Sequence, residues 1–424
     1  MTSGNPAPQD ATGAGGTTAR ASSHGTIAAL GPAFVAAIAY VDPGNVAANV
    51  SAGAGHGYLL VWVLVLANLM AMVIQYLSAK LGIVTGLSLP QVLGDSLPPG
   101  TRVLYWAQAQ LMAIATDVAE VIGGALALWL LFGIPLPLGG VIVAALSMLV
   151  LALQNHRGQR VFETVILGML GIITVGFLGG LVVGPPDPRG VLDGLVPRLE
   201  GFESLVIAAG MLGATVMPHA IYIHSALSRD RHGMGHAPER VSQLLRATRV
   251  DVVLALVVAG AVNIGMLLLA ARNLYGVEGT DTIEGAQHAI SDALGPAVGV
   301  VFSLGLLASG LASTAVGAYA GDVVTAGLLR WRIPLLARRL ITVIPAVVIL
   351  ALGAEPTAAL VGSQVVLSFG IAFALIPLVR ATGRASLMGR FRNGPVLAAI
   401  GWVSAAIVVV LNVVLLVMGV GNVG

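Results

Sequence analysis

The sequence predicts an all-α integral membrane protein whose first ten transmembrane helices form two inverted five-helix repeats, followed by an eleventh helix. Three observations support this fold class: a composition too apolar for a soluble domain, about eleven apolar runs of membrane-spanning length, and interruptions at equivalent positions in two of those runs. Of the 424 residues, 57% are hydrophobic and only 9% are charged, whereas soluble domains carry about 25% charged residues. The chain has no cysteine, which excludes disulfides, thiolate catalysis and cysteine metal sites.

Each predicted span is an apolar run of roughly 20 residues, long enough to cross ~30 Å of hydrocarbon. The runs lie near residues 27–53, 58–84, 103–132, 138–154, 161–184, 202–227, 248–271, 296–328, 337–353, 358–379 and 395–420. Residues 24–424 therefore form one membrane domain, with the first repeat at about 24–185, the second at about 200–380 and the extra helix at about 395–420. Residues 1–23 are rich in Gly, Ala, Ser and Thr, which predicts a disordered cytoplasmic tail.

The basic residues predict the orientation. With the N-terminus in the cytoplasm, only three of the 21 Lys and Arg fall outside, namely Arg189, Arg198 and Arg272. The other eighteen fall on the cytoplasmic side, as the positive-inside rule requires: Arg20, Lys80, Arg102, Arg157, Arg160, Arg229, Arg231, Arg240, Arg246, Arg249, Arg330, Arg332, Arg338, Arg339, Arg380, Arg384, Arg390 and Arg392. We therefore expect a multi-pass protein of the cell (inner) membrane, with a cytoplasmic N-terminus and an extracytoplasmic C-terminus. The charges are spread over short loops, so no nucleic-acid partner is expected.

The first interrupted span contains the stretch DPGN at residues 42–45. Asp42 is the only acidic residue of this span, and Pro43 and Gly44 follow it directly. A proline has no backbone N–H and interrupts a helix. A carboxylate inside a membrane span is costly and usually marks a functional site.

The second interruption is the stretch MPH at residues 217–219, in the sixth span. Here Pro218 stands between Met217 and His219. Five spans separate the two interruptions, and because five is odd, the second repeat must be inverted across the membrane. Interrupted segments at matching positions of two repeats are a sequence signal for a transporter's binding site near the midplane.

The backbone supplies potential ligands at both interruptions. The N–H of residue i bonds the carbonyl of residue i−4 in an α-helix, so Pro43 leaves the carbonyl of Ala39 unpaired and Pro218 leaves that of Ala214 unpaired. With the side chains of Asp42, Asn45 and Met217, these carbonyls make five candidate ligands. Oxygen ligands suit a hard divalent cation, and a thioether favours Mn²⁺, Fe²⁺ and softer metals over Mg²⁺ or Ca²⁺.

Plainer interpretations of the same residues exist. A proline in a membrane helix is often only a kink, DPGN can be a loop between two short helices, and a buried methionine is usually packing. The joint occurrence in both repeats favours a site over packing.

Other polar residues lie inside the predicted spans. Asp117 and Glu120 are three residues apart in span three and so share one helix face, where they mark a proton route or form a structural ion pair, with Arg338 and Arg339 as counter-ions. Unperturbed histidine titrates near neutral pH, so His219 and His224 are candidate proton carriers, although a lone membrane histidine is more often hydrogen-bonded packing. Gln364 and Asn412 either join helices or line a cavity.

Both interruption motifs, in this order, resemble those of the Nramp transporters, a family of proton-coupled importers of manganese and iron. The resemblance runs from about Gly31 to span eleven and includes NLMAMVIQYLSAKLGIVTG, ATDVAEVIG, RRLITVIPA and SQVVLSFGIAFALIPL. It implies a LeuT-type fold and a metal site formed by Asp42, Asn45, Met217 and the carbonyls of Ala39 and Ala214, joined by Gln364 in some states. It also implies a proton route from Asp42 and His219 through Asp117 and Glu120 to Arg338 and Arg339.

We therefore expect a monomeric secondary transporter that imports Mn²⁺, Fe²⁺ and related divalent cations by proton symport, with no resident cofactor. The main alternative is a LeuT-type sodium-coupled amino-acid symporter, in which an anionic Asp42 would repel the substrate carboxylate. A passive channel is a third interpretation. An enzyme is not expected, because no HExxH motif occurs and no Ser–His pair has motif support.

Overall fold

The computed structural model describes residues 32–157, 159–331 and 334–423, and every regular element in these ranges is a helix. This confirms the predicted all-α class. The predicted tail, residues 1–23, and residues 27–31 of the first predicted span lie outside the described residues. The division into domains and repeats by residue number stays a prediction.

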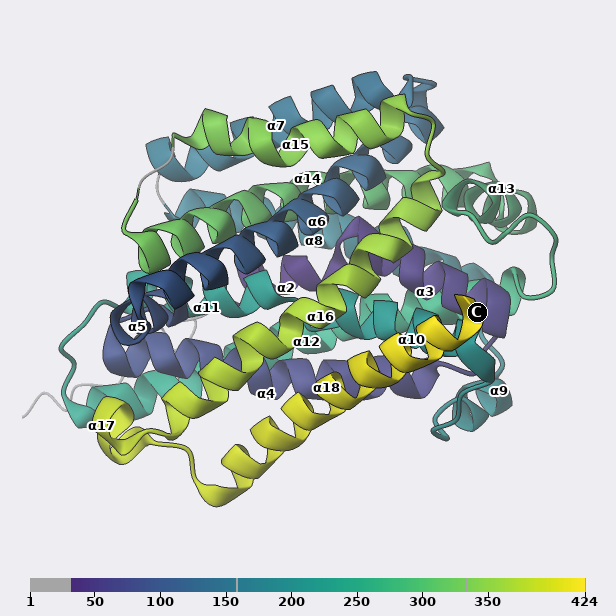
Figure 1. Cartoon of the computed structure of the whole chain (residues 1–424). Helices are drawn as coiled ribbons and strands as arrows, with labels where there is room; N and C mark the ends of the chain where they lie inside the picture. Colours follow the sequence, from purple (N-terminus) through teal and green to yellow (C-terminus); the bar gives the residue numbers. More distant parts are fainter. Residues whose placement is uncertain (1–31, 158, 332–333, 424) are drawn as a thin grey trace, which may run out of the picture.

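The helices are labelled as in Figure 1. In chain order they are α2 (Pro32–Ile38), the 3₁₀ helix η1 (Ala39–Val41), α3 (Pro43–His56), α4 (Val61–Thr85), α5 (Leu89–Ser96), α6 (Pro99–Phe132), α7 (Leu136–Arg157), α8 (Gln159–Val183), α9 (Pro188–Asp193), α10 (Gly201–Thr215), α11 (Pro218–His232), α12 (Pro238–Asn273), α13 (Ile283–Leu294), α14 (Pro296–Leu329), α15 (Leu335–Ala351), α16 (Pro356–Gly383), α17 (Ala385–Met388), the 3₁₀ helix η2 (Gly389–Phe391) and α18 (Pro395–Val423).

The apolar helices match the predicted spans. Among the described residues, eight helical segments are long and apolar enough to cross a membrane, with Gly201–His232 taken as one segment. Three shorter apolar segments, at Pro32–Val41, Leu136–Val150 and Leu340–Ala351, correspond to predicted spans one, four and nine. The chain is therefore a multi-pass membrane protein.

The two predicted interruptions are breaks in the helices. Span one is divided into α2, η1 and α3 at Asp42, and span six is divided into α10 and α11 at Val216 and Met217. The other spans continue without such a gap in the part of the chain that the structure describes. The cause is local, since Pro43 and Pro218 each open the following helix at its first position, where a missing N–H costs nothing.

Several helices differ from the predictions in extent or were not predicted. The α12 helix begins at Pro238, ten residues before predicted span seven, because the polar segment before Thr248 is also helical. The short helices α5, α9, α13 and α17 were not predicted, since none is long enough to span a bilayer.

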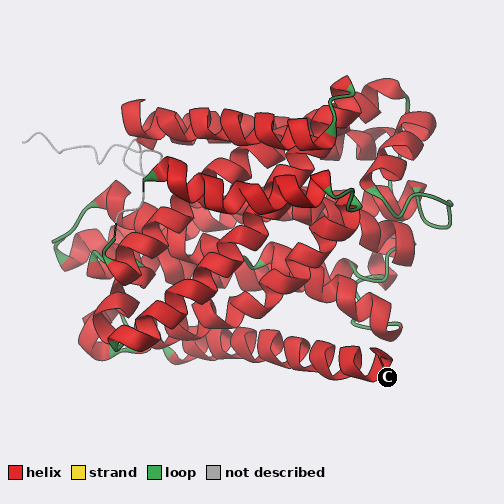
Figure 2. Cartoon of the chain, turned by 45° about the horizontal axis from the view of Figure 1, so that its top comes forward, coloured by secondary structure: helices red, strands yellow, loops and turns green. Residues whose placement is uncertain are grey.

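The long helices run roughly across the view in Figure 1, and short helices mark the two ends of the bundle. We call the end that carries α5 and α17, at the left, the α5 end, and the end that carries α9 and α13, at the right, the α13 end. Figure 2, turned by 45°, shows the same layered helices joined by short loops.

The broken helices lie inside the bundle and the last helix lies on its outside. The α3 segment packs against α12 and α10, while α10 packs along α16. The α18 helix lies along α16, where Asn412 Nδ2 donates to the carbonyl of Ser368 at 2.8 Å and Ser368 Oγ donates to Asn412 Oδ1 at 2.7 Å. Of the two interpretations of Asn412, the structure supports the one in which it joins helices.

Candidate functional site

The first break places a carboxylate at the start of a helix. Asp42 has extended backbone angles, φ −73° and ψ 167°, and forms the N-cap of α3. Its Oδ1 accepts hydrogen bonds from the backbone N of Asn45 at 2.9 Å and from Asn45 Nδ2 at 2.7 Å. Asp42 is fully buried, and the positive end of the α3 dipole stabilises its negative charge.

The second break places a methionine in the same kind of position. The α10 helix ends at Thr215, and Met217, with φ −71° and ψ 132°, precedes α11 as its N-cap residue. The Met217 side chain is fully buried and does not cap the helix by a hydrogen bond. A thioether without a capping role is therefore held beside an unwound stretch of backbone.

The two breaks meet at one side chain. Asn45 Nδ2, which contacts Asp42, also donates to the carbonyl oxygen of Ala214 at 2.8 Å. Gln364 of α16 lies over the same point, with its Nε2 3.4 Å from Asp42 Oδ2. A Cβ atom on Gly44 would lie 1.7 Å from Gln364 Nε2, so a larger residue there would push this amide away from Asp42.

Side chains of neighbouring helices donate hydrogen bonds to two backbone carbonyls of the first break. Asn263 Nδ2 of α12 donates to the carbonyl of Tyr40 at 2.6 Å, and Ser309 Oγ of α14 donates to that of Val41 at 2.5 Å. Ala39, whose carbonyl the sequence predicts to be unpaired, opens the adjacent 3₁₀ turn. Asn263 and Ser309 were not predicted, although each is a polar residue within an apolar run, which is the signal that could have found them.

The two histidines of α11 have different surroundings. His219 Nδ1 lies 3.4 Å from Thr116 Oγ1 of α6, and its Nε2 is buried without a hydrogen-bond partner among the described residues. His224 Nδ1 lies 2.6 Å from Gln75 Oε1 of α4. Gln75 in turn donates to the Tyr40 hydroxyl beside the first break. His219 therefore faces α6, which carries the acidic pair, and His224 faces α4.

Asp117 and Glu120 are both buried in α6. The Glu120 carboxylate lies against α14, where a Cβ on Gly317 would be 3.1 Å from Glu120 Oε2. The positions of Arg338 and Arg339 belong to α15, but their side chains lie outside the described residues. Their predicted role as counter-ions stays a prediction.

No group of three or more His, Cys, Asp or Glu that could hold a metal ion occurs among the described residues. A metal site built only from titratable side chains is therefore not present in this part of the chain. The convergence at the two breaks offers a different donor set: one carboxylate, two amides, a thioether and backbone carbonyls.

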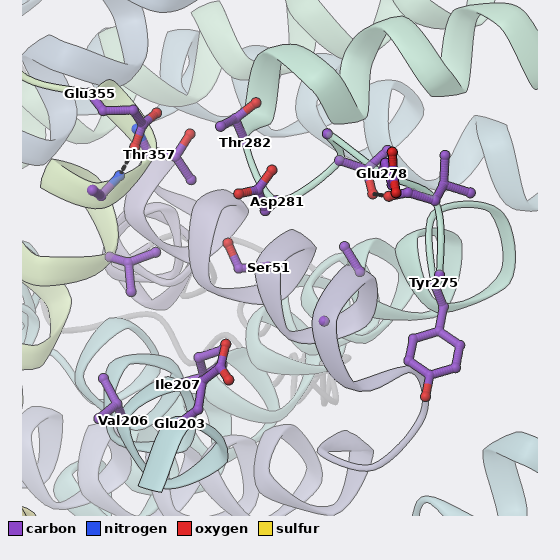
Figure 3. A pocket seen from close by; sticks show the side chains of 18 residues that line it. Ser51, Glu203, Val206, Ile207, Tyr275, Glu278, Asp281, Thr282, Glu355 and Thr357 are labelled. Carbon is purple, nitrogen blue, oxygen red and sulfur yellow. Dashed lines mark hydrogen bonds between the residues drawn. The ribbon is translucent and has the colours of Figure 1, made fainter.

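An acidic cavity of about 940 Å³ opens at the α13 end. Figure 3 shows its lining from the end of α3, the start of α10, the start of α16 and the loop before α13. Its charged lining residues are all acidic: Glu203, Glu278, Asp281 and Glu355. The residues at the two breaks do not line it, so the cavity ends before the buried site.

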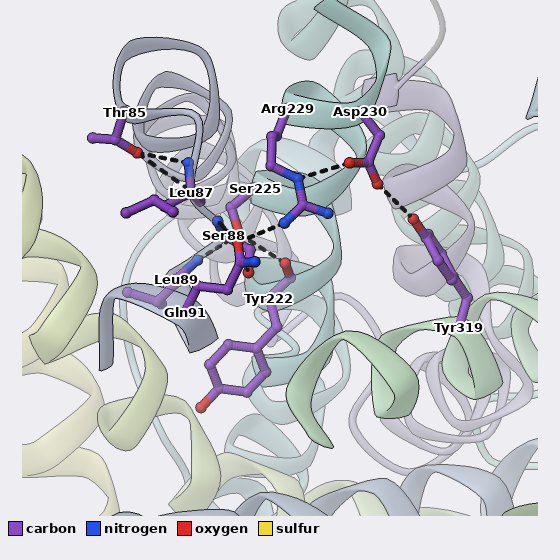
Figure 4. Close-up of polar contacts among 10 residues, drawn as sticks. All are labelled: Thr85, Leu87, Ser88, Leu89, Gln91, Tyr222, Ser225, Arg229, Asp230 and Tyr319. Atoms are coloured by element: carbon purple, nitrogen blue, oxygen red, sulfur yellow. Dashed lines mark hydrogen bonds and ion pairs between the residues drawn. The ribbon is translucent and has the colours of Figure 1, made fainter. Parts of the chain in front are cut away.

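The α5 end is held by polar contacts between α5, α11 and α14 (Figure 4). Arg229 of α11 donates to Gln91 Oε1 of α5 at 2.5 Å and forms an ion pair with Asp230 at 2.7 Å. Tyr319 of α14 donates to Asp230 Oδ2 at 3.1 Å. These contacts join three helices between the buried site and this end of the bundle.

A membrane bundle with two helices broken at a shared buried site has the architecture of a secondary transporter. The comparison with solved structures agrees. The chain is similar to a manganese transporter of Eremococcus coleocola solved with an aromatic bis-isothiourea compound, with a TM-score of 0.83, 30% identity, and coverage of 92% of this chain and 86% of that chain. A weaker likeness to MhsT in complex with L-phenylalanine, at 14% identity and a TM-score of 0.56, supports the LeuT-type fold alone.

The sequence comparisons define the family. Residues 33–418 match the family described as "Nramp: Natural resistance-associated macrophage protein-like". The divalent metal cation transporter MntH of Mycobacterium tuberculosis is 57% identical over 387 residues, which cover 91% of this chain and 90% of that protein. The MntH of Bacillus subtilis is 46% identical over 398 residues, covering 93% and 92%. The chain belongs to the Nramp family of membrane transporters, and the predicted resemblance is confirmed.

Proposed function

We propose that this protein imports divalent transition-metal cations, Mn²⁺ and also Fe²⁺, into the cytoplasm by proton symport. The relatives named as divalent metal cation transporters and the solved manganese transporter support the class of substrate. The proposed metal ligands are Asp42, Asn45, Met217 and the carbonyls of Ala39 and Ala214, with Gln364 joining in some states.

One observation carries this proposal. Two oxygen acceptors from different broken helices, Asp42 Oδ1 and the Ala214 carbonyl, converge on one amide nitrogen at 2.7 and 2.8 Å. That nitrogen belongs to Asn45, whose amide has a nearly isosteric oxygen on its other branch. Rotation of the amide removes the donor from this point and presents a third oxygen, so that a cation can bind where the N–H groups were.

The donor set fits a transition metal better than an alkaline-earth ion. A carboxylate, an amide oxygen and carbonyls suit any hard divalent cation. The Met217 sulfur adds affinity for Mn²⁺, Fe²⁺ and softer ions and adds little for Mg²⁺ or Ca²⁺. An amino-acid substrate would bring its own carboxylate against the buried Asp42, which disfavours the sodium-coupled amino-acid alternative.

Proton coupling follows from the same carboxylate. Asp42 has to be deprotonated to bind a metal ion, so metal arrival is linked to proton release. His219 directly follows Pro218 and contacts α6, which carries Asp117 and Glu120. We propose that the proton passes from His219 along the acidic residues of α6, away from the metal, toward Arg338 and Arg339.

We place the α13 end outside the cell and the α5 end, with the N-terminus, in the cytoplasm. In this orientation the acidic cavity faces the metal supply, and the Arg229 contacts separate the site from the cytoplasm. The membrane potential contributes ~2.3 kcal/mol per unit charge per 100 mV, which favours inward movement of a divalent cation. Import then requires α5, α11 and α14 to separate.

Uptake into proteoliposomes tests the proposed function. We expect saturable Mn²⁺ uptake that increases when the inner compartment is made alkaline and that excess Ca²⁺ or Mg²⁺ does not suppress. Protein-free liposomes are the control for leakage. Mn²⁺ uptake that does not change with the pH gradient would contradict proton symport. Sodium-driven uptake of an amino acid without metal uptake would contradict the whole proposal.

The first prediction concerns selectivity. Met217→Ala is expected to keep Mn²⁺ uptake and to lose discrimination against Ca²⁺ and Mg²⁺, because only oxygen donors remain. The measurement is Mn²⁺ uptake with increasing Ca²⁺ or Mg²⁺ as competitor. Met211→Ala is the matched control, since Met211 is equally buried on α10 but lies away from the break. Unchanged selectivity in Met217→Ala would remove the role assigned to the sulfur.

The second prediction concerns the acidic cavity. Replacing Glu278 with Gln and Asp281 with Asn together is expected to raise the KM for Mn²⁺ about threefold at low salt with kcat unchanged, because the carboxylates attract cations to the cavity mouth. The difference should shrink at high salt, where such fields are screened. Asp292→Asn, on the exposed face of α13 and outside the cavity lining, is the control. Equal effects of both changes, or a KM shift that salt does not reduce, would contradict this prediction.

A further inference from the structure

A second cavity lies on the outside of the bundle, away from the transport site. It has a volume of about 510 Å³ and is formed by α4, α12 and the first turns of α18. The α4 helix packs against both α12 and α18 (Figure 1). Its lining is mainly apolar and includes Met72 and Val73 of α4, Val253 of α12 and Ile400 of α18. Val253 and Ile400 are each 42% exposed on the outer face of the bundle, so the groove is open toward lipid.

One cation, Arg249, lines the α5 end of this groove, and a second, Lys80, is buried nearby without lining it. Arg249 of α12 lines it, with its guanidinium 5.4 Å from the centre of the Tyr76 ring. Lys80 follows Tyr76 by one turn of α4, and its Nζ donates to Asn393 Oδ1 at 2.9 Å. Because Arg249 lies over the ring of Tyr76, one turn before Lys80 on α4, the two positive charges are near each other.

Neither charge is balanced by a carboxylate within the part of the chain that the structure describes. Lys80 contacts an amide oxygen, and Arg249 contacts an aromatic ring. Glu239, an acidic residue near this end, pairs instead with Arg390 at 3.9 Å. The Arg249 guanidinium that lines the groove, with the Lys80 charge near it, favours an anionic ligand at this point.

The level of the cations in the bundle identifies the class of ligand. The apolar segment of α12 begins just beyond Arg249, and α18 begins at Pro395 beside the same groove. The cations therefore lie where the hydrocarbon region begins, and the apolar groove continues from them along the helices. This arrangement matches a phospholipid, whose phosphate lies at the membrane surface and whose acyl chain lies parallel to the helices. Basic pockets between helices on the cytoplasmic side bind anionic headgroups.

We propose that this groove binds an anionic glycerophospholipid of the cytoplasmic leaflet, with its phosphate held by Arg249 and attracted by the nearby charge of Lys80, and with an acyl chain lying between α4, α12 and α18. Through these contacts the lipid joins α18, on the outside of the bundle, to two helices that pack against the broken segments α3 and α11. The proposal does not depend on which ion the protein transports.

Native mass spectrometry of the detergent-purified protein, titrated with phosphatidylglycerol or phosphatidylcholine, tests the proposal. We expect one phosphatidylglycerol to bind saturably and more tightly than phosphatidylcholine. Arg249→Gln should weaken this binding about fivefold, the effect of one basic residue at a membrane surface, whereas Arg249→Lys should largely keep it. Ile400→Trp, which fills the groove without changing any charge, should weaken it as well.

Arg240→Gln is the matched control, because Arg240 is an exposed arginine in the first turn of α12 that does not line the groove. Equal losses of phosphatidylglycerol binding in Arg240→Gln and Arg249→Gln would mean that general surface charge, and not this groove, attracts the lipid. That result would overturn the proposal. Unchanged binding in Ile400→Trp would show that no chain lies in the groove. A dimer that Ile400→Trp dissociates would identify the occupant as a second copy of the protein and would also overturn it.

Discussion

The Asp42→Asn variant is expected to fold normally and to lose Mn²⁺ uptake by more than about a hundredfold. Asn is as good an N-cap as Asp, so the start of α3 is preserved. The negative charge is lost, and a unit charge about 4 Å from another contributes about 4 kcal/mol at an effective dielectric constant of 20, with twice that for a dication. Uptake of Mn²⁺ into proteoliposomes is the measurement, with thermal stability in detergent as the check on folding.

Two further variants separate the capping role of Asp42 from its charge. Asp42→Ala removes both and is expected to be less stable than Asp42→Asn by about 1 kcal/mol. Asp187→Asn is the control, since Asp187 caps α9 through Arg189 N at 3.2 Å and Gly190 N at 3.1 Å and is exposed away from the site. It should transport normally. Substantial uptake by Asp42→Asn at normal stability would contradict the assignment of Asp42 as a metal ligand.

The breaks in spans one and six could be predicted from the sequence because their cause is local. Pro43 and Pro218 cannot donate a backbone hydrogen bond, and no tertiary contact changes that. The number and order of the spans were predictable for a similar reason, since the length of an apolar run is compared with a fixed bilayer thickness. The capping role of Asp42 was also predictable, because Asp followed by Pro is a signal for a helix start, although only its role as a ligand was predicted.

The partners of the polar residues were not predictable, because periodicity does not say which helix a side chain faces. His219 and His224 are five residues apart on α11, yet one contacts α6 and the other contacts α4. The contacts of Asn263 and Ser309 with the backbone of the first break depend on how α12 and α14 pack, which no local pattern specifies. The short helices at the bundle ends lack a membrane-spanning length and so gave no comparable signal.

The central contact between α10 and α16 leads to the second large expected effect. Gly213 lies one residue before Ala214, and a Cβ atom on it would lie 2.1 Å from the backbone oxygen of Gln364 and 2.9 Å from the backbone N of Ser368. Backbone atoms within a helix cannot move aside as a side chain can, so α10 and α16 would have to separate. Gly213→Ala is expected to destabilise the protein by about 1–3 kcal/mol or more and to abolish uptake, because separation displaces Gln364 from Asp42.

Gly210→Ala provides the comparison on the same helix, one turn earlier. A Cβ there would lie 3.7 Å from the nearest atom, on Val365, which is ordinary van der Waals contact. Alanine also favours a helix over glycine by about 1 kcal/mol, so this variant should be as stable as the parent or slightly more stable, with uptake retained. Thermal unfolding in detergent and Mn²⁺ uptake are measured on both variants. Gly213→Ala should lose stability and uptake, whereas Gly210→Ala should keep both. Similar behaviour of the two would mean that α10 and α16 are not packed backbone to backbone at Gly213, and that the site does not depend on this contact.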